Sequence, residues 1–376
     1  MKDGGAKFDK LKLRYYSENY RGVHASQDIK NGECLLKVPL SQIITLEMGF
    51  KSPIGKLMYE KGLRNRLISP KHSFLCAYIL QEKKKAKQEF VEFLDILPKS
   101  FEDYPIFFTE EEREFLKGSP FLSQIHEKIE DIKTDYNLIC KEVPEFGAFT
   151  LREYSEARVM VSSRIFGITV NNVKTDGFVP LADMLNHRRP RQTTWYYDDS
   201  RDAFIIDACD DIPRGQQVYD SYGRKCNSRF FLNYGFINLN NDADEVPITV
   251  AIDKSDPGYE VKIKLINEKV DWKKFRVVEN LEDPIMHEFL SWVRYVTYDG
   301  DLGYLCLQKN QAVIEAQKKR QQNGQDSDED DTYHDDADCF KGTSLKPINM
   351  DSEMQMWTKI KELCLAQLAL YPTTLE

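Results

Sequence analysis

The sequence lacks the cysteine and histidine spacing of a zinc site. Its 8 cysteines are scattered over 376 residues, with no Cys-x-x-Cys pair and no histidine at zinc-ligand spacing. Long apolar runs are also missing, and the polar start Met1-Lys2-Asp3 does not resemble a signal peptide. These absences argue against a bound metal and a membrane span. We therefore expect reduced, mostly buried thiols in a protein of the cytoplasm or nucleus.

A strongly basic surface is missing as well. The formal net charge is -9, which argues against a general nucleic-acid binder. Much of the excess lies in one run, 326–338, which has eight acidic residues and no Lys or Arg, so the rest of the chain is close to neutral. This composition is typical of a solvated loop. We expect 322–340 to be disordered and assign it no catalytic role.

The sequence does contain enough apolar material for more than one core. Hydrophobic residues make up 41% of the chain and charged residues 30%, and 21 Phe and 19 Tyr offer large areas to bury. A chain of 376 residues also exceeds the usual size of one hydrophobic core. We therefore expect two cores.

The hydrophobic pattern changes along the chain. Short apolar runs between turn residues predict small strands from Gly22 to Thr45 and again after Gly167. The later runs are 178–181, 193–197, 203–207 and 217–219. Between these β regions, from about Ser73, apolar residues recur at helical spacing, and Thr109 followed by three glutamates is a good helix start. The pattern predicts a β region split by a helical insert.

Beyond about Asp242 the pattern is mostly helical. A short apolar alternation at 246–252 comes first, and three segments of helical period follow at 284–298, 304–320 and 354–370. We expect a second, mainly helical domain. The whole chain is thus predicted to be an α+β protein.

Two short segments carry polar residues that suit chemistry. Asp183-Met-Leu-Asn-His187 ends an apolar run, and Ser221-Tyr222-Gly223 follows a predicted strand. An isolated Asn-His pair is more often a turn cap beside a packed, neutral histidine than a functional site. A functional interpretation is favoured by further segments in a fixed order, which are 163–166, 212–215 and 227–236.

In this order the segments resemble the SET-domain methyltransferases, in the subclass typified by the Rubisco large-subunit lysine methyltransferase and the actin-histidine methyltransferase. Residues 20–25 and 28–33 resemble the opening cofactor loop and hairpin of that family. The segment 183–187 resembles its Asn-His motif, and 221–223 its catalytic tyrosine segment. The helical insert of the subclass is resembled by 93–98, 105–112 and 116–120. The similarity covers nearly the whole chain beyond roughly Arg14.

The resemblance implies a fold and an activity. The fold is a SET-domain β-fold of several small sheets, formed by 1–72 and 166–242 around a helical insert at 73–165, with a helical substrate-binding domain at 243–376. The activity is methyl transfer from S-adenosylmethionine to a protein side chain. We expect a lysine-bearing protein as substrate, no direct contact with nucleic acid or membrane, and a monomer.

The resemblance also implies which residues bind the cofactor, and these are Arg21, Gly22, Val23, Arg164, Asn186 and His187. Gly22 allows a close approach of the backbone, and Arg164 could pair with the methionine carboxylate. A surface or structural ion pair is the alternative for Arg164. Asn186 could accept a hydrogen bond from the amino group of the cofactor, and the backbone at His187 could face adenine.

Methyl transfer is an in-line displacement at carbon, which needs a neutral nucleophile held close to the methyl. The resemblance implies that the Tyr222 hydroxyl stands near the departing methyl and that Tyr234 and Phe236 line the substrate channel. Packing in the core or beside adenine is the alternative for Phe236. A lysine must first lose its proton, and burial in an aromatic channel lowers the pKa of a lysine in the helpful direction. No metal is required.

Two alternatives stay open. The acceptor could be a protein histidine, because the same fold serves both and the channel residues that separate them are not readable from the sequence. The chain could also be a catalytically silent SET scaffold that binds a protein partner. Tyr20 is the one hint of a scaffold, because many relatives have glycine at this position of the opening loop.

Overall fold

The chain divides into two compact units. In the computed structural model these are Met1–Phe115 with Phe121–Leu239, and Leu116–Pro120 with Asn240–Glu376. The structure describes residues 1, 3–17, 20–85, 90–266, 270–301, 303–304 and 347–372. Each unit has its own cluster of buried apolar side chains, which confirms the two cores expected from the length of the chain.

The first unit contains three small sheets. The first sheet has the order β1-β2-β10-β7, the second β3-β9-β8 and the third β4-β6-β5. Neighbouring strands are antiparallel except β10 and β7, which run parallel. The strands are β1 (Leu11–Tyr15), β2 (Arg21–Ala25), β3 (Cys34–Pro39), β4 (Ile44–Thr45), β5 (Ile165–Val170), β6 (Val173–Phe178), β7 (Asn186–His187), β8 (Thr193–Asp198), β9 (Ala203–Ala208) and β10 (Gln217–Asp220).

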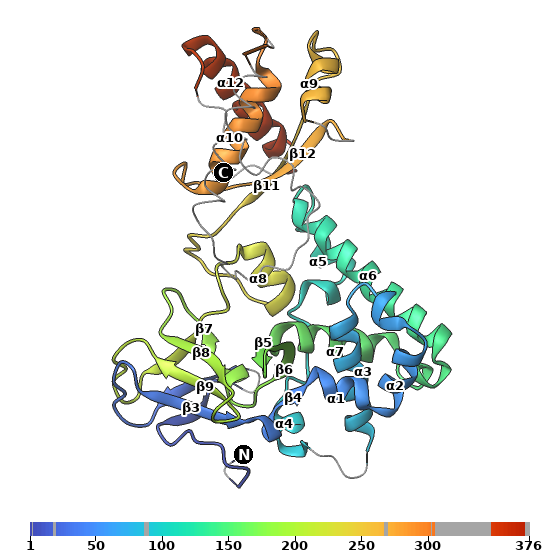
Figure 1. The fold of residues 1–376 in the computed structure, drawn as a ribbon, viewed down its shortest axis with the longest axis vertical. Helices are drawn as coiled ribbons and strands as arrows, with labels where there is room; N and C mark the ends of the chain where they lie inside the picture. The colour runs from blue at the N-terminus through green and yellow to red at the C-terminus, as the bar shows by residue number, and fades with distance from the viewer. Residues whose placement is uncertain are drawn as a thin grey trace. The chain divides into compact units, whose positions relative to one another are not determined.

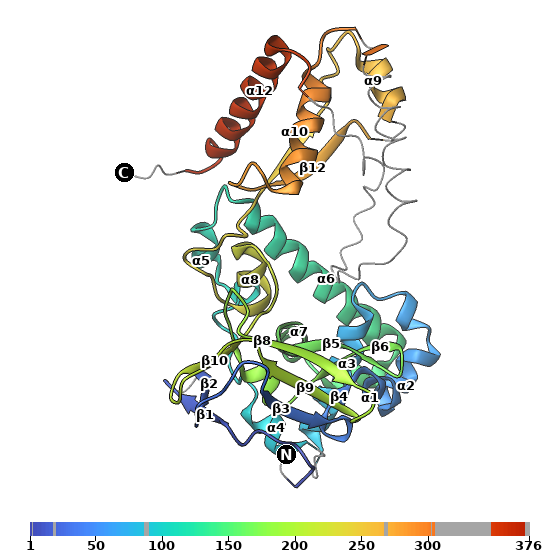
Figure 2. The same ribbon diagram turned by 60° about the vertical axis from the view of Figure 1, so that its left-hand side comes forward.

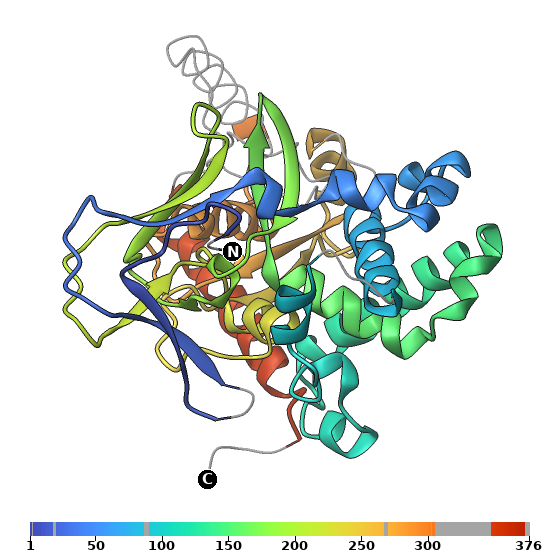
Figure 3. The same cartoon turned by 90° about the horizontal axis from the view of Figure 1, so that it is seen from below.

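Most helices of this unit lie between β4 and β5 in the sequence, so a helical insert does split the strands. They are α1 (Leu46–Lys51), α2 (Pro53–Glu60), α3 (Pro70–Lys84), α4 (Val91–Ile96), α5 (Glu110–Glu114), α6 (Pro120–Glu142) and α7 (Leu151–Arg164), and α8 (Asn227–Tyr234) follows the last strand. In Figures 1 and 2, α1, α2, α3, α6 and α7 gather on one side of the sheets. Figure 3 shows β1 and β2, in dark blue, on the opposite side.

Local sequence signals explain several helix starts. The side chains of Thr109 and Thr150 each accept a hydrogen bond from the backbone amide three residues later. The side chains of Glu112 and Glu153 accept one from the backbone amides of these threonines, so α5 and α7 both begin with a capping box. The expected helix start at Thr109 is thereby confirmed. Ser52 caps α2 through the backbone amide of Gly55, and the proline that follows it suits the first helical turn.

Two local expectations are wrong. Helices begin already at Leu46 rather than near Ser73, because α1 and α2 are short and do not show a long helical period. The run 178–181 is not a strand, because β6 ends at Phe178 and Leu181 adopts a φ of 73°. Pro180 in between has no amide hydrogen to donate to a ladder.

The second unit combines helices with one two-stranded sheet. Strands β11 (Val246–Ala251) and β12 (Trp272–Val277) pair antiparallel, and the helices are α9 (Tyr259–Ile266), α10 (Pro284–Thr297) and α12 (Met350–Leu368). Figure 2 shows α12, in red, running beside α10, against which it packs. The unit is mainly helical as expected, although β12 was not foreseen. The expected helix at 304–320 and the acidic loop at 322–340 lie outside the described residues, apart from Tyr304.

Candidate functional site

The short parallel pairing of β10 with β7 brings the two motifs together. Tyr219 lies opposite Asn186, and Asp220 lies opposite His187. Tyr222 therefore stands two residues beyond the end of the strand that pairs with the Asn-His segment. Segments that are more than thirty residues apart in the sequence thus form one site at this sheet edge.

Asn186 ties this edge to strand β2. Its side-chain Nδ2 donates to the backbone carbonyl of Arg21 at 2.9 Å and to Oε1 of Gln217 at 2.7 Å. Both hydrogens of the amide are thus used, while no described residue donates to its Oδ1. The remaining oxygen is an acceptor that an amino group could use.

Arg164, at the end of α7, forms an ion pair with a buried carboxylate. Its Nη1 donates to Oδ2 of Asp183 at 3.1 Å and to the Asp183 backbone carbonyl at 3.0 Å. Burial raises the pKa of Asp183, and Arg164 and then Arg21 oppose this with their positive charges. The structural ion pair, which was the alternative expected for Arg164, is therefore present.

Several buried polar atoms at this site have no hydrogen-bond partner among the described residues. They are Nη2 of Arg21, Nε of Arg164, Oδ1 of Asp183 and Nε2 of His187. Buried polar atoms in folded proteins are nearly always satisfied, and an unsatisfied group costs about 1–3 kcal/mol. A concentration of unsatisfied donors and acceptors within one site is what a polar, charged ligand would complete.

His187 is neutral and held in one tautomer. Its Nδ1 accepts a hydrogen bond from the backbone amide of Tyr222 at 2.9 Å, so the proton lies on Nε2. Burial, followed by the positive charges of Arg189 and Lys225, lowers the pKa of His187 to about 4. The ring therefore stays uncharged at neutral pH and can pack among aromatic side chains.

Tyr222 stands in an aromatic cluster. Its ring stacks on Tyr234 with the centroids 5.0 Å apart, and its hydroxyl donates to the backbone carbonyl of Leu185 at 2.7 Å. Phe236 lies 6.2 Å from Tyr222 and 6.1 Å from His187 between ring centroids, and Phe230 lies 4.7 Å from His187. The structure thus gathers the predicted catalytic tyrosine and both predicted channel residues.

The opening loop offers less room to a ligand at Gly22 and Val23 than was expected. A Cβ at Gly22 would lie 2.4 Å from Oε1 of Gln217 and 2.8 Å from the Tyr16 hydroxyl, so side chains of this chain crowd the glycine. Val23 is fully buried in the core, so it can offer only its backbone to a ligand. Tyr20 has no positive φ and is 57% exposed, with its ring 4.8 Å from Tyr16.

Comparison with known proteins decides the family. A model of the SET domain matches residues 20–223, which is more than half of the chain. The chain belongs to the SET-domain family. The strands of the first unit and both motifs of the site lie in or next to this SET domain.

The curated relatives of this SET-domain protein include actin-histidine N-methyltransferases. The Gallus gallus protein is 24% identical over 388 residues, and the Homo sapiens protein is 25% identical over 388 residues. In both cases the alignment covers 100% of this chain and 60% of the relative. The chain therefore spans about 60% of the length of the curated relatives that it matches.

Solved structures of similar fold come from the Rubisco enzyme LSMT. The SET domain of LSMT bound to lysine and AdoHcy superposes with a TM-score of 0.71 at 21% identity and covers 99% of this chain and 80% of that chain. Rubisco LSMT bound to AdoMet gives a TM-score of 0.69 at 21% identity, with 97% and 78% covered. The α+β SET fold and the resemblance to this subclass are confirmed.

Sequence reasoning missed three residues that support the SET-domain site. Asp183 and Gln217 hold Arg164 and Asn186, and Tyr104 lies under the turn that follows α8, its ring 3.2 Å from where a Cβ of Gly235 would be. Asp183 is the first residue of the 183–187 motif, so that motif already pointed to it. No sequence pattern pointed to Gln217 or Tyr104, because their contacts join distant segments.

Lys128, on α6, was also missed, and it anchors the end of helix α8. Its Nζ donates to Oδ1 of Asn233 at 2.6 Å and to the backbone carbonyl of Leu232 at 3.2 Å. A cation at a helix C-terminus is favourable because of the helix dipole. Tyr234 follows Asn233 in the sequence, and its ring stacks on Tyr222. Lys128 therefore fixes one wall of the aromatic cluster.

We predict a pH-dependent effect of Lys128→Met. Burial, followed by the charge of Arg158, lowers the pKa of Lys128 from 10.5 to about 7. The unfolded chain binds the proton of Lys128 more tightly than the folded protein does. The free energy of unfolding of the wild type therefore increases as the pH is raised from 7 to 10.5, and that of the variant, which lacks this amine, increases less. Urea unfolding at pH 7 and pH 9 measures the difference, with Lys133→Met on the same helix as control. A difference between wild type and Lys128→Met that does not change with pH contradicts this account.

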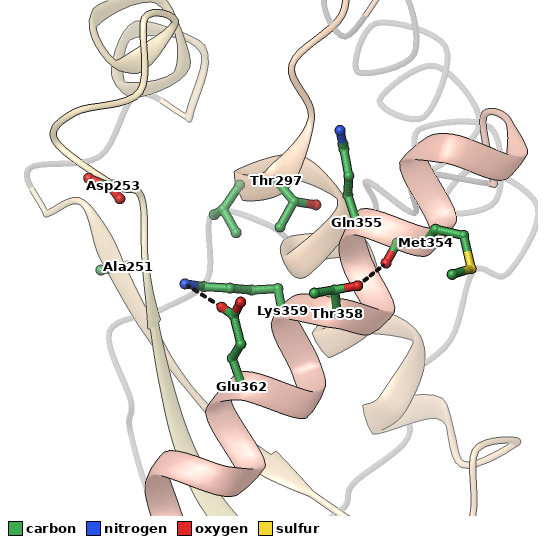
Figure 4. Close-up of a pocket in the computed structure, with 9 residues that line it drawn as sticks. Ala251, Asp253, Thr297, Met354, Gln355, Thr358, Lys359 and Glu362 are labelled. Atoms are coloured by element: carbon green, nitrogen blue, oxygen red, sulfur yellow. Dashed lines mark hydrogen bonds and ion pairs between the residues drawn. The ribbon is translucent and has the colours of Figure 1, made fainter.

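A hollow of about 440 Å3 lies in the second unit. It is lined by Ala251, Asp253, Val296, Thr297, Met354, Gln355, Thr358, Lys359 and Glu362. Figure 4 shows Lys359 reaching toward Glu362, and the pair is 3.6 Å apart along α12. Exposed pairs of this kind contribute little, so the lining offers no arrangement comparable to the site around Tyr222.

Neither a metal cluster nor a membrane helix stands out in the described part of the chain. No group of three or more His, Cys, Asp or Glu side chains there could hold a metal ion. None of its described helices is long and apolar enough to cross a membrane.

Proposed function

We propose that this SET-domain protein transfers a methyl group from S-adenosylmethionine to a protein side chain and that the acceptor is a lysine. The observation that carries the proposal is the group of unsatisfied buried polar atoms around Asn186, next to an aromatic cluster that contains Tyr222. The polar part suits the charged end of the cofactor. The aromatic part suits methyl transfer away from water.

The cofactor would supply an activated methyl on a sulfonium, and the chain offers partners for its other groups. Nε of Arg164 and Nη2 of Arg21 are buried donors that suit a carboxylate. Oδ1 of Asn186 is an acceptor that suits an amino group. The ordered backbone at β7 and the aromatic ring of His187 suit the adenine side.

We assign to Tyr222 the stabilisation of the partial positive charge on the methyl group during transfer. Its hydroxyl hydrogen is directed to the Leu185 carbonyl, so the lone pairs of the oxygen remain available to a partial positive charge. Because this hydrogen bond fixes the oxygen in advance, no reorganisation is needed when charge develops on the methyl. Burial raises the pKa of the Tyr222 hydroxyl, which keeps it protonated at neutral pH.

We place lysine before histidine because a solved structure of similar fold holds lysine, and the surroundings of Tyr222 would help a lysine to lose its proton. Tyr234 and Phe236 provide apolar walls beside it, and burial raises the pKa of Tyr234 to about 12. Such a setting disfavours a charged amine and so promotes the neutral nucleophile. A protein histidine remains the second candidate, because the similar curated proteins are actin-histidine N-methyltransferases.

Calorimetry with S-adenosylmethionine tests the proposal against a silent scaffold. We expect saturable binding to the folded protein, because the ring of Tyr20 is exposed and lies beside Tyr16. The absence of any heat in a protein shown to be folded would favour the scaffold. Incubation of labelled cofactor with a lysate, followed by mass spectrometry, then identifies the methylated residue as lysine or histidine.

Asn186→Ala should weaken the affinity for S-adenosylmethionine by about tenfold or more. The substitution removes an acceptor for the buried amino group, and it also releases the Arg21 carbonyl and Gln217. Calorimetry gives the affinity, and Asn137→Ala, at an exposed position of α6, is the matched control. Unchanged affinity would remove Asn186 from the cofactor assignment.

The substrate is proposed to be a protein, bound with the help of the second unit. We also propose that the protein acts as a monomer in the cytoplasm or nucleus. Size-exclusion chromatography with light scattering checks the oligomeric state.

A further inference from the structure

The aromatic cluster contains a buried carboxylate that has no assigned role. Asp220 is the last residue of β10 and is only 3% exposed. Its Oδ1 accepts a hydrogen bond from the Thr193 hydroxyl at 3.3 Å, but no described Lys, Arg or His forms an ion pair with it. A buried carboxylate without a cation is costly, so its presence calls for an explanation.

The register of the strands places Asp220 beside the site. It lies opposite His187 in the parallel pairing, so the two side chains project from the same face of the ladder. The ring of His187 on that face contacts Tyr222, Phe230 and Phe236. Asn186 and Gln217 point to the other face, where they hydrogen-bond to each other. Asp220 is thus on the aromatic side of the site, not on the polar side.

The charge of Asp220 acts on both hydroxyl groups of the cluster. Burial is the main reason for the raised pKa of Tyr222 and of Tyr234, and the negative charge of Asp220 adds to both. Burial also raises the pKa of Asp220 itself to about 6, so the carboxylate is still mostly ionised at pH 7. The positive charge of Arg191 opposes this effect of burial but forms no ion pair with Asp220, so the site combines apolar walls with one negative charge that has no direct counter-ion among the described residues.

An ammonium group is the chemical complement of such a site. It would pair with the carboxylate, and the aromatic faces of Tyr222 and Tyr234 would add favourable contact with a cation. We propose that Asp220 binds the ammonium group of the acceptor lysine and thereby selects lysine over apolar side chains of the same length. This inference rests on the proposed function and specifies its substrate.

The proposal agrees with the need for a neutral nucleophile. Transfer of a proton from the lysine ammonium to Asp220 breaks an N–H bond and forms an O–H bond, with no other reactant. Burial raises the pKa of a carboxyl and lowers that of an amine, so it brings the two closer together. The carboxylate can therefore bind the charged lysine first and take its proton afterwards.

Free amino acids provide a direct test. LSMT has been crystallised with lysine and AdoHcy, so L-lysine in the presence of saturating AdoHcy is a suitable probe for a protein of this fold. L-Norleucine has the same four-carbon side chain, with a hydrogen atom in place of the ammonium group. Binding of both is measured by calorimetry for the wild type, for Asp220→Asn and for Asp210→Asn, which changes an exposed acid two residues after β9.

We expect the wild type and Asp210→Asn to bind lysine at least about tenfold more tightly than norleucine. Asp220→Asn should lose most of this preference while binding norleucine and AdoHcy like the wild type. Equal affinity of the wild type for the two amino acids, or an unchanged preference in Asp220→Asn, overturns the proposal. Failure of the wild type to bind AdoHcy would instead refute the proposed function.

Discussion

Tyr222→Phe should lower the rate of methyl transfer by about 10²- to 10³-fold, in the range seen when one preorganised polar group is removed from a transition state. The substitution removes only the hydroxyl oxygen. That oxygen is fixed by its hydrogen bond to the Leu185 carbonyl, so it is in place before charge develops on the methyl. The aromatic stack on Tyr234 is retained by phenylalanine.

Affinity for S-adenosylmethionine should change little in this variant. The backbone amide of Tyr222 still donates to His187, and the polar groups of Arg164 and Asn186 are untouched. The rate is the labelled methyl incorporated into the substrate found in the lysate, and calorimetry gives the affinity. Tyr59→Phe, at an exposed ring of α2, is the control. An unchanged rate removes Tyr222 from the chemistry, and a lost affinity assigns it to the cofactor.

The centre of the site could be predicted because its residues stand in short motifs. Tyr222, Tyr234 and His187 were named from segments whose order carries the information. In the structure the ring of Tyr222 lies 5.2 Å from that of His187 and 5.0 Å from that of Tyr234, and both of these lie 6.1 Å from Phe236. Their supports could not be found in this way. Lys128 reaches Asn233 from a helix more than a hundred residues earlier, and only the fold makes them neighbours.

The same limit applies to secondary structure. Helix α6 has 23 residues, enough to show its helical period, and β9 contains an unbroken apolar run, so both were expected. The short helices α1 and α2 did not stand out, because 6 and 8 residues are too few to show a helical period, and β12 did not, because three of its 6 residues are Lys or Arg. Exposed and buried residues alternate in β12, but the exposed positions include Trp272 and the buried ones include a lysine, Lys273. Pairing with β11 and packing against its buried face, rather than the pattern of its own sequence, make this segment a strand.

Asp135→Ala should destabilise the first unit by about 3–5 kcal/mol, the usual cost of breaking a buried ion pair by removing one partner. Asp135 is fully buried on α6, and its Oδ2 accepts from Nη1 of Arg158 on α7 at 3.0 Å. Its oxygens also accept from the backbone amides of Ile68 at 2.7 Å and Ser69 at 3.1 Å. The substitution therefore leaves a buried guanidinium without its counter-ion and two backbone amides without their acceptor.

The loss of stability is measured by urea unfolding, and hydrogen exchange shows whether it falls on α3, α6 and α7. Glu130→Ala, which removes an exposed partner of Lys133 on the same helix, should cost no more than about 0.5 kcal/mol. In a second variant, Arg158→Met combined with Asp135→Ala, stability should partly return, because no buried charge is left unpaired. A cost for Asp135→Ala as small as that for Glu130→Ala would mean that packing of these helices, rather than the Asp135 network, holds α7 and the Arg164 at its end in place.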